Sequence, residues 1–115
     1  MDYIDGFVVP VPNAKKEEYR QLAAAAAVLF KEFGALSVVE AWGDDVPPGK
    51  LTSFPLAVQL EPEETAVFSW VRWPSKASRD QGMKKFMEDD RLKEMGMPFD
   101  GNRMIYGGFQ IIVDA

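Results

Sequence analysis

Hydrophobic residues are concentrated in four short stretches of the chain, and these stretches predict β-strands. Three of them combine aromatic and β-branched residues over a short length: residues 2–11 (DYIDGFVVPV), 35–43 (ALSVVEAWG) and 65–73 (TAVFSWVRW). The fourth, residues 103–113 (RMIYGGFQIIV), contains a glycine pair, which indicates a bulge or a close approach of the backbone. Pro10 and Pro12 should end the first strand or confine it to a sheet edge.

Two further stretches follow the helical period. The first begins after Asn13, a suitable capping residue, and ends at Gly34. Its predicted buried positions are Tyr19, Leu22, Ala23, Ala26, Phe30 and Phe33. The second follows Pro74, with Ser75 or Ser78 as its cap. Its predicted buried face consists of Ala77, Met83, Phe86 and Met87. Residues 52–60 (TSFPLAVQL) fit either a helical turn or an extended segment.

The order of these elements predicts one α+β domain over residues 1–115. Strand, helix, strand, strand, helix and strand is the ferredoxin-like βαββαβ arrangement, in which both helices cover one face of a four-stranded antiparallel sheet. The first, third and fourth strands are apolar at both odd and even positions, so both faces of the sheet should be covered. Since one chain has helices for only one face, we expect a homodimer that packs the two open sheet faces together.

The alternation along each strand divides the side chains into two sets. We assign to the helix-covered face the small and aliphatic set, namely Ile4, Gly6, Val8, Val39, Ala41, Val67, Ser69 and Val71. The aromatic and charged set is then expected to face the partner subunit, and consists of Tyr3, Asp5, Phe7, Glu40, Trp42, Phe68, Trp70 and Arg72. Any cavity between the sheets would be lined by this second set.

Composition narrows the partners and the chemistry. The net charge is −5 and the basic residues are scattered, which argues against a nucleic-acid partner. The longest apolar run, LAAAAAVLF, is far shorter than the roughly 20 residues of a membrane helix, and we expect a soluble cytoplasmic protein. Without Cys or His, acid-base chemistry would fall to Asp, Glu, Lys, Tyr or water, and no cofactor is expected.

Four stretches carry a resemblance to a known family: DGFVVPVP, KEFGALSVVEAWGDDVPPGK, FSWVRWPSKASRD and PFDGNRMIYGGF. Together they resemble the YbaA-like family of small uncharacterised bacterial proteins. The resemblance implies the dimeric α+β barrel superfamily, whose members include cofactor-free oxygenases, isomerases, haem proteins and ligand-binding domains. Fold alone does not choose among these activities, and the absence of His speaks against a histidine-ligated haem.

Glu40 is the candidate catalytic base. Between aromatic rings its pKa would be raised by burial, which suits a cofactor-free proton transfer. Alternatively, Glu40 forms an ion pair with Arg72 that fixes the register of neighbouring strands. Glu40 and Asp44 would lie roughly 13 Å apart along an extended strand, which disfavours a shared proton. A metal at Glu40, Asp44 and Asp45 is also disfavoured, because Asp residues before a Pro-Gly turn commonly bond their own backbone.

The remaining candidates would bind a ligand. Asp5, Trp42, Trp70 and Arg72 could line the cavity, with the tryptophans either stacking on a flat molecule or anchoring the dimer. Arg103 could clamp a carboxylate or pair with an acidic neighbour, and Tyr106 lies on the same strand. The sequence therefore predicts a homodimer of uncharacterised activity with a small-molecule cavity between its sheets. The alternative is a cofactor-free oxygenase or isomerase that uses a carboxylate base.

Overall fold

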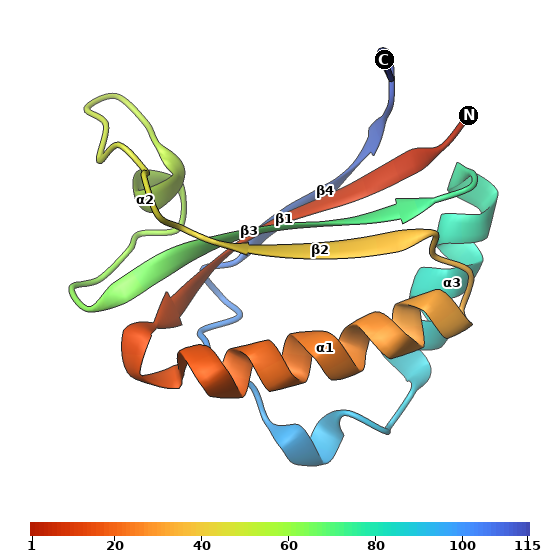
Figure 1. The fold of residues 1–115 in the computed structure, drawn as a ribbon, viewed down its shortest axis with the longest axis horizontal. Helices are drawn as coiled ribbons and strands as arrows, with labels where there is room; N and C mark the ends of the chain where they lie inside the picture. Colours follow the sequence, from red (N-terminus) through yellow and green to blue (C-terminus); the bar gives the residue numbers. More distant parts are fainter.

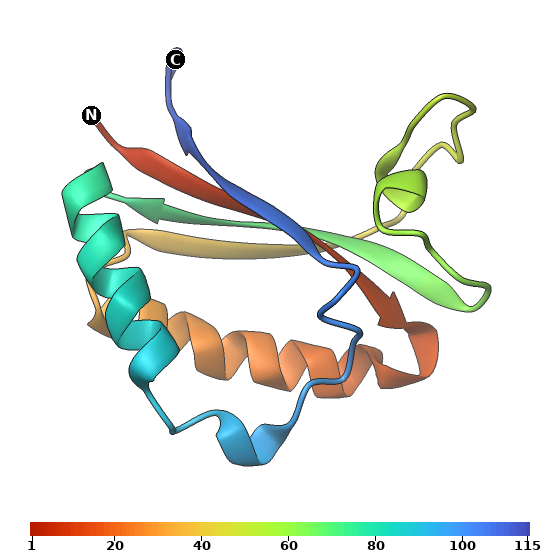
Figure 2. The same ribbon diagram turned by 180° about the vertical axis from the view of Figure 1, so that it is seen from behind.

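A computed structural model describes all residues from 1 to 115 and has a single four-stranded sheet. Its strands are β1 (Tyr3–Pro12), β2 (Ser37–Trp42), β3 (Glu64–Trp73) and β4 (Ile105–Gln110). They lie in the order β2-β3-β1-β4, and every neighbouring pair is antiparallel. The helices α1 (Lys16–Glu32) and α3 (Lys76–Glu88) lie beneath one face of this sheet (Figures 1 and 2). The predicted βαββαβ fold is confirmed.

Short helical turns fill the connections. The 3-10 turns η1 (Asn13–Lys15) and η2 (Lys93–Met95) precede α1 and follow α3, respectively. The ambiguous segment 52–60 contains one helical turn, α2 (Phe54–Ala57), because the side chain of Ser53 accepts a hydrogen bond from the Leu56 amide at its start. In Figure 1, α2 and its loop rise on the side of the sheet opposite α1 and α3. The chain has no helix that is long and apolar enough to cross a membrane.

Of the three helix ends predicted from the sequence, two agree with the structure. Gly34 follows α1 with a φ of 113°, a conformation that glycine adopts without strain. At the start of α3, the Ser75 hydroxyl accepts a hydrogen bond from the Ser78 amide, so Ser75 is the cap. The prediction for Asn13 is wrong: it lies in η1, and its side chain accepts a hydrogen bond from Thr65 on β3 instead of capping α1.

Of the two alternatives for Pro10 and Pro12, the end of the strand is correct, since β1 ends at Pro12, and the position at a sheet edge is wrong. β1 is a central strand, since it pairs with β3 along its whole length. Its other neighbour, β4, pairs only as far as Val8. At the two prolines, β3 is therefore the only neighbour of the strand. Proline has no N–H group, and on the side without a neighbour no hydrogen bond of the sheet requires one.

The assignment of side chains to the two faces is correct for β3 and wrong for β1 and β2. Val67 and Val71 lie in the clusters under the helices, as predicted, together with Tyr3 and Val9 of β1. Directly paired residues of antiparallel strands point to the same face of the sheet, so the residues of β1 and β2 that pair with Val67 and Val71 also lie under the helices. The helix-covered face thus contains Tyr3, Asp5, Phe7, Val9, Val11, Val38, Glu40 and Trp42.

Close packing beneath the sheet depends on two glycines. A methyl group on Gly82 of α3 would lie 2.3 Å from the Trp73 ring, so the helix can approach this fully buried tryptophan only without a side chain there. On β4, a methyl group on Gly108 would lie 2.5 Å from the Tyr3 hydroxyl and 2.5 Å from Arg79. The predicted glycine pair is therefore a close approach, and it sits in regular register with β1 rather than in a bulge.

The opposite face of the sheet is covered only in part, by α2 and its loop, where Val8, Val58 and Ala66 form a small buried cluster. It presents large apolar side chains to solvent, including Phe68, Ile105 and Phe109, which are 44%, 43% and 60% exposed. The segment after β4 rises from the same side, where Ile112 and Val113 are also exposed (Figure 1). Phe54 of α2 packs against Phe68 in an edge-to-face contact, with ring centroids 5.7 Å apart. We call this apolar surface the open sheet face.

Candidate functional site

The residues predicted to line one cavity are divided between the two faces of the sheet. Trp70 and Arg72 belong to the open sheet face, whereas Asp5, Glu40 and Trp42 point toward the helices. The prediction that these five residues line one common cavity is therefore wrong. The cause is that both parities of β1 and β2 are apolar enough to be buried, so the pattern did not indicate which one faces the helices.

A groove lies between α1 and the edge strand β2. It encloses about 520 Å³, which is in the range of small-molecule pockets. Its apolar walls come from Ala23, Ala24, Ala27, Val38 and Val67. The alanine run of α1 provides the room, since small side chains leave space between the helix and the strand. Polar groups of Lys16, Glu17, Tyr19, Arg20 and Glu40 complete the lining.

Tyr19 and Glu40 form the polar centre of this groove. The buried Tyr19 hydroxyl donates a 2.6 Å hydrogen bond to Oε1 of Glu40. Glu40 comes from β2 and Tyr19 from the first turns of α1, so the bond joins the two walls. Tyr19 was predicted only as a core residue. The sequence did not indicate that its hydroxyl would contact Glu40, because this contact depends on how α1 crosses the sheet.

The surroundings of Glu40 favour its protonated form. Burial by protein atoms raises the pKa of Glu40, and hydrogen bonds to Tyr19 and Ser69 act in the opposite direction without outweighing it. Glu40 is nevertheless an exposed residue of the edge strand β2, so solvent reaches its side chain through the open groove. Burial and the adjacent carboxylate raise the pKa of Tyr19, so its hydroxyl remains a hydrogen-bond donor. Glu40 is thus a carboxyl group whose pKa lies above the ordinary value of a glutamate, which strengthens it as a proton acceptor once it is ionised.

Trp42 forms the end of the groove next to Glu40. The two residues share one face of β2, as the alternation predicted. The ammonium group of Lys16 lies over the Trp42 ring, 4.9 Å from its centroid, which is a cation-π contact. The groove therefore combines a carboxyl group, a phenol, an indole and a cation around an apolar floor.

Asp5 belongs to a different polar cluster and has a structural environment. It is buried and accepts hydrogen bonds from the Trp73 indole at 3.0 Å and from Arg79 Nη2 at 2.8 Å. Arg79 also lies over the Tyr3 ring. Both carboxylate oxygens of Asp5 accept hydrogen bonds, so Asp5 ties α3 to β1 and presents no free group to a ligand.

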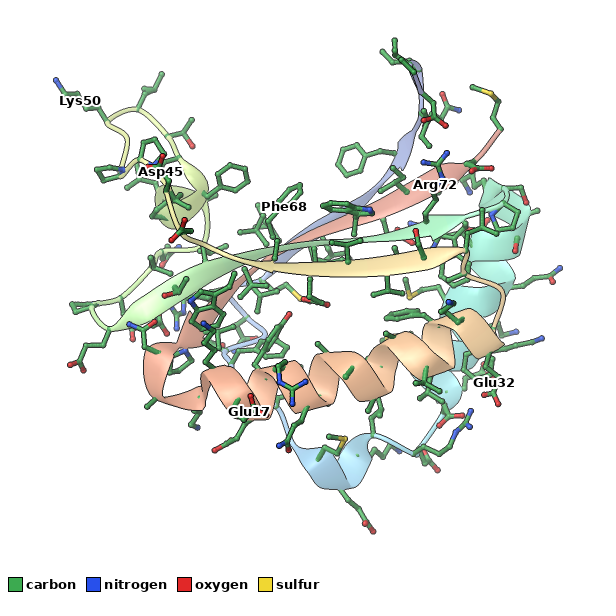
Figure 3. All side chains as sticks on the ribbon, in the orientation of Figure 1. Glu17, Glu32, Asp45, Lys50, Phe68 and Arg72 are labelled. Atoms are coloured by element: carbon green, nitrogen blue, oxygen red, sulfur yellow. The ribbon has the colours of Figure 1, made fainter.

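Arg72 and Trp70 line a shallow hollow of about 810 Å³ on the open sheet face. Arg72 does not contact Glu40. It binds Asp2 at 2.7 Å and Asp114 at 2.5 Å, and so connects the two ends of the chain. Figure 3 shows Arg72 on the side of the sheet opposite α1. The alternative of a Glu40–Arg72 ion pair is wrong, because Arg72 is paired with Ile4 and Ser37 in the sheet and points away from the helices.

Arg103 pairs with acidic neighbours, as one of its two predicted roles required. Its guanidinium makes two 2.8 Å hydrogen bonds to the Glu64 carboxylate and one of 3.0 Å to Asp100. Tyr106 is exposed and stacks on Phe7, with ring centroids 6.4 Å apart. Neither residue lines the α1–β2 groove. The chain contains no group of three His, Cys, Asp or Glu residues placed to hold a metal ion.

Comparison with known sequences places the chain in a family. The family model described as "Protein of unknown function (DUF1428)" matches residues 2–101. The uncharacterized protein YbaA of Escherichia coli K12 is 60% identical over 116 residues, which covers 99% of both chains. The YbaA protein of Shigella flexneri matches with the same identity and coverage. The resemblance found in the sequence is confirmed.

Comparison with solved structures supports the fold. A dimeric ferredoxin-like protein from an uncultured marine organism superposes with a TM-score of 0.63 at 9% identity, covering 100% of both chains. The protein Rv0793 from Mycobacterium tuberculosis superposes with a TM-score of 0.53 at 11% identity, covering 100% of this chain and 99% of the other. At these identities the likeness shows a ferredoxin-like fold alone.

Proposed function

We propose that this chain, which belongs to the DUF1428 family of proteins of unknown function, binds a small organic molecule in the α1–β2 groove. Glu40 would exchange a proton with the bound molecule. One observation carries the proposal: the hydrogen bond of Tyr19 to Glu40 lies inside an apolar groove large enough for a ligand. The raised pKa of the Glu40 carboxyl makes its carboxylate a stronger base than an ordinary glutamate.

The reaction class that fits is an isomerisation through an enol or enolate. Glu40 would take a proton from a carbon next to a carbonyl group, and the electron pair of that C–H bond would move toward the carbonyl oxygen. Return of the proton to another atom of the same molecule completes the reaction, so no oxidant or cofactor is consumed. Tyr19 would hold the Glu40 carboxylate in place and stabilise its charge during the transfer. A cofactor-free oxygenation would share the first step and require O₂ as a second reactant.

Hydrogen-deuterium exchange on a simple ketone tests the proposal. Acetophenone is flat and apolar and has exchangeable protons next to its carbonyl group. We expect the protein to accelerate exchange of its methyl protons in D₂O, followed by NMR. Glu40→Gln should lower the rate constant by about 10²-fold or more, since it removes a general base. Glu18→Gln, an exposed glutamate of α1 outside the groove, is the matched control. Equal rates for the protein and Glu40→Gln would refute the proposal.

We also propose that two copies pack through their open sheet faces. The support is the exposed apolar surface around Phe68, Ile105 and Phe109, which α2 and its loop cover only in part. Large exposed apolar patches on soluble proteins mark interaction surfaces. The dimeric description of the marine ferredoxin-like neighbour agrees with such pairing. In this arrangement the α1–β2 groove lies on the other side of the sheet, so dimer formation leaves it accessible.

A further inference from the structure

Lys16 is the cation of the α1–β2 groove that has no acidic partner. It takes part in none of the ion pairs of the chain. The other cation of the groove, Arg20, is held by Glu17 through hydrogen bonds of 2.9 and 2.6 Å. The charges of Arg20 and Glu17 therefore offset each other. The positive charge of Lys16 remains available at the groove.

The position of Lys16 is set by Trp42. Its ammonium group lies over the indole ring, 4.9 Å from the centroid, which holds a flexible side chain against one wall of the groove. An ammonium group has three donors, and the contact with the ring occupies one side of it. The remaining donors can bind an anionic oxygen. A flat molecule bound there would lie beside both the indole and the cation.

The spacing along β2 fixes the size of such a molecule. Trp42 is two residues from Glu40 on the same face of the strand, so their Cα atoms are about 6.6 Å apart along an extended strand. A benzene ring with substituents at opposite positions spans about the same length. A ring-sized molecule can therefore contact Lys16 at one end while its other end reaches Glu40.

We propose that the ligand of the groove is a planar organic acid with its carboxylate on Lys16 and its carbonyl end at Glu40. This inference rests on the proposed function of Glu40 and adds the chemical class of the substrate. The proton that Glu40 accepts comes from the carbon beside the carbonyl group, and the electron pair is delocalised onto the carbonyl oxygen. The carboxylate does not react and serves only to position the molecule, so Lys16 is a positioning residue.

A pair of matched ketones tests this assignment. 4-Acetylbenzoate carries a carboxylate opposite an exchangeable methyl ketone, and 4-acetylbenzamide is its neutral counterpart. We expect the second-order rate constant for methyl proton exchange, corrected for the uncatalysed rate, to be about fivefold higher for the acid at low salt. This preference should decrease as salt is added, because an exposed ion pair is screened.

Substitutions at two adjacent lysines separate a specific contact from general charge. Lys16→Met should remove the preference for the acid, and Lys16→Arg should retain it. Lys15→Met removes the same charge from an exposed residue outside the groove and should leave the preference unchanged. Equal rates for acid and amide, both lost in Glu40→Gln, would overturn the role of Lys16 and leave the proposed function intact. If neither ketone showed exchange that depends on Glu40, both proposals would fail.

Discussion

The Tyr19 hydroxyl on α1 lies 2.6 Å from Oε1 of Glu40 on β2 and donates a hydrogen bond to it. The two residues are 21 positions apart in the chain, and they meet because the first turns of α1 cross beneath the edge strand. The bond fixes the carboxyl group at the polar centre of the α1–β2 groove. The same contact therefore has a structural role, joining helix to sheet, and provides the group that we propose to exchange protons.

Removing the phenol hydroxyl should change the ionisation of Glu40. The Tyr19 hydrogen bond lowers the pKa of Glu40 against the larger effect of burial. We therefore expect Tyr19→Phe to raise the pKa of Glu40 further, measured by NMR from the pH dependence of its side-chain carboxyl ¹³C shift. Tyr106→Phe, at an exposed tyrosine outside the groove, should leave the titration of Glu40 unchanged. An unaltered or lowered pKa in Tyr19→Phe would contradict the geometry of the groove.

Stability should depend on pH through Glu40. Its pKa is raised in the folded protein, so the folded state binds more protons than the unfolded state between the two pKa values. The free energy of unfolding then falls as pH rises through this window above the ordinary pKa of a glutamate. Glu40→Gln cannot ionise, so its stability relative to the natural protein should improve from acidic to neutral pH. Urea unfolding across this range measures the difference, and a constant difference would show that Glu40 titrates normally.

A charge on the open sheet face should separate the proposed dimer. Phe109→Asp places a carboxylate in the centre of the apolar surface, where pairing would have to bury it. We expect light scattering at micromolar concentration to give the mass of two chains for the natural protein and of one chain for this variant. Val28→Asp is the control, because Val28 is equally apolar and 68% exposed, but lies on α1. A natural protein that is monomeric at this concentration would contradict the pairing.

The ion pair of Arg103 with Glu64 should stabilise the fold. Their side chains are only 16% and 7% exposed, and two hydrogen bonds join them. Arg103→Met should lower the free energy of unfolding, because it leaves the Glu64 carboxylate without its partner. Arg20→Met, which breaks an exposed pair with Glu17, should lower it much less.

The pH dependence of the Arg103 variant gives a second check. Hydrogen bonds from Arg103 lower the pKa of Glu64 in the folded protein. The stabilisation is therefore complete above the ordinary pKa of a glutamate and is lost as pH falls through the lowered value. The deficit of Arg103→Met, measured by urea unfolding, should shrink in acid. A deficit that is independent of pH would indicate lost packing instead of a lost ion pair.

A methyl group at Gly82 should disturb the packing of α3 on the sheet. It would lie 2.3 Å from Trp73 Cζ3 and 2.7 Å from the Phe33 carbonyl oxygen, and Trp73 has no free space to move into. We expect Gly82→Ala to destabilise the protein by about 1–3 kcal/mol, although alanine normally favours helices over glycine. Gln81→Ala, at the exposed neighbouring position, should be neutral or stabilising. A more stable Gly82→Ala would show that α3 sits further from Trp73. Urea unfolding provides the comparison.

The candidate site was predictable only in part. Glu40 and Trp42 were identified because a carboxylate and an aromatic residue share one face of a short strand. Tyr19, Lys16 and the alanines of α1 were not assigned to the site, since nothing in a helical pattern indicates which strand lies opposite. Arg72 was expected at Glu40 because their strands are neighbours. It lies on the other face, since Glu40 is paired with Ser69 and not with Arg72.

The sequence by itself determined the order of strands and helices and their approximate ends. These depend on local physical causes: the spacing of apolar residues, the Ser75 cap, and the left-handed conformation of Gly34. Only the tertiary structure decided which face of β1 and β2 lies under the helices, because both parities of β1 are apolar and either could be buried. That choice depends on strand register and on the path of α1, which join residues distant in the chain and bring Tyr19 to Glu40.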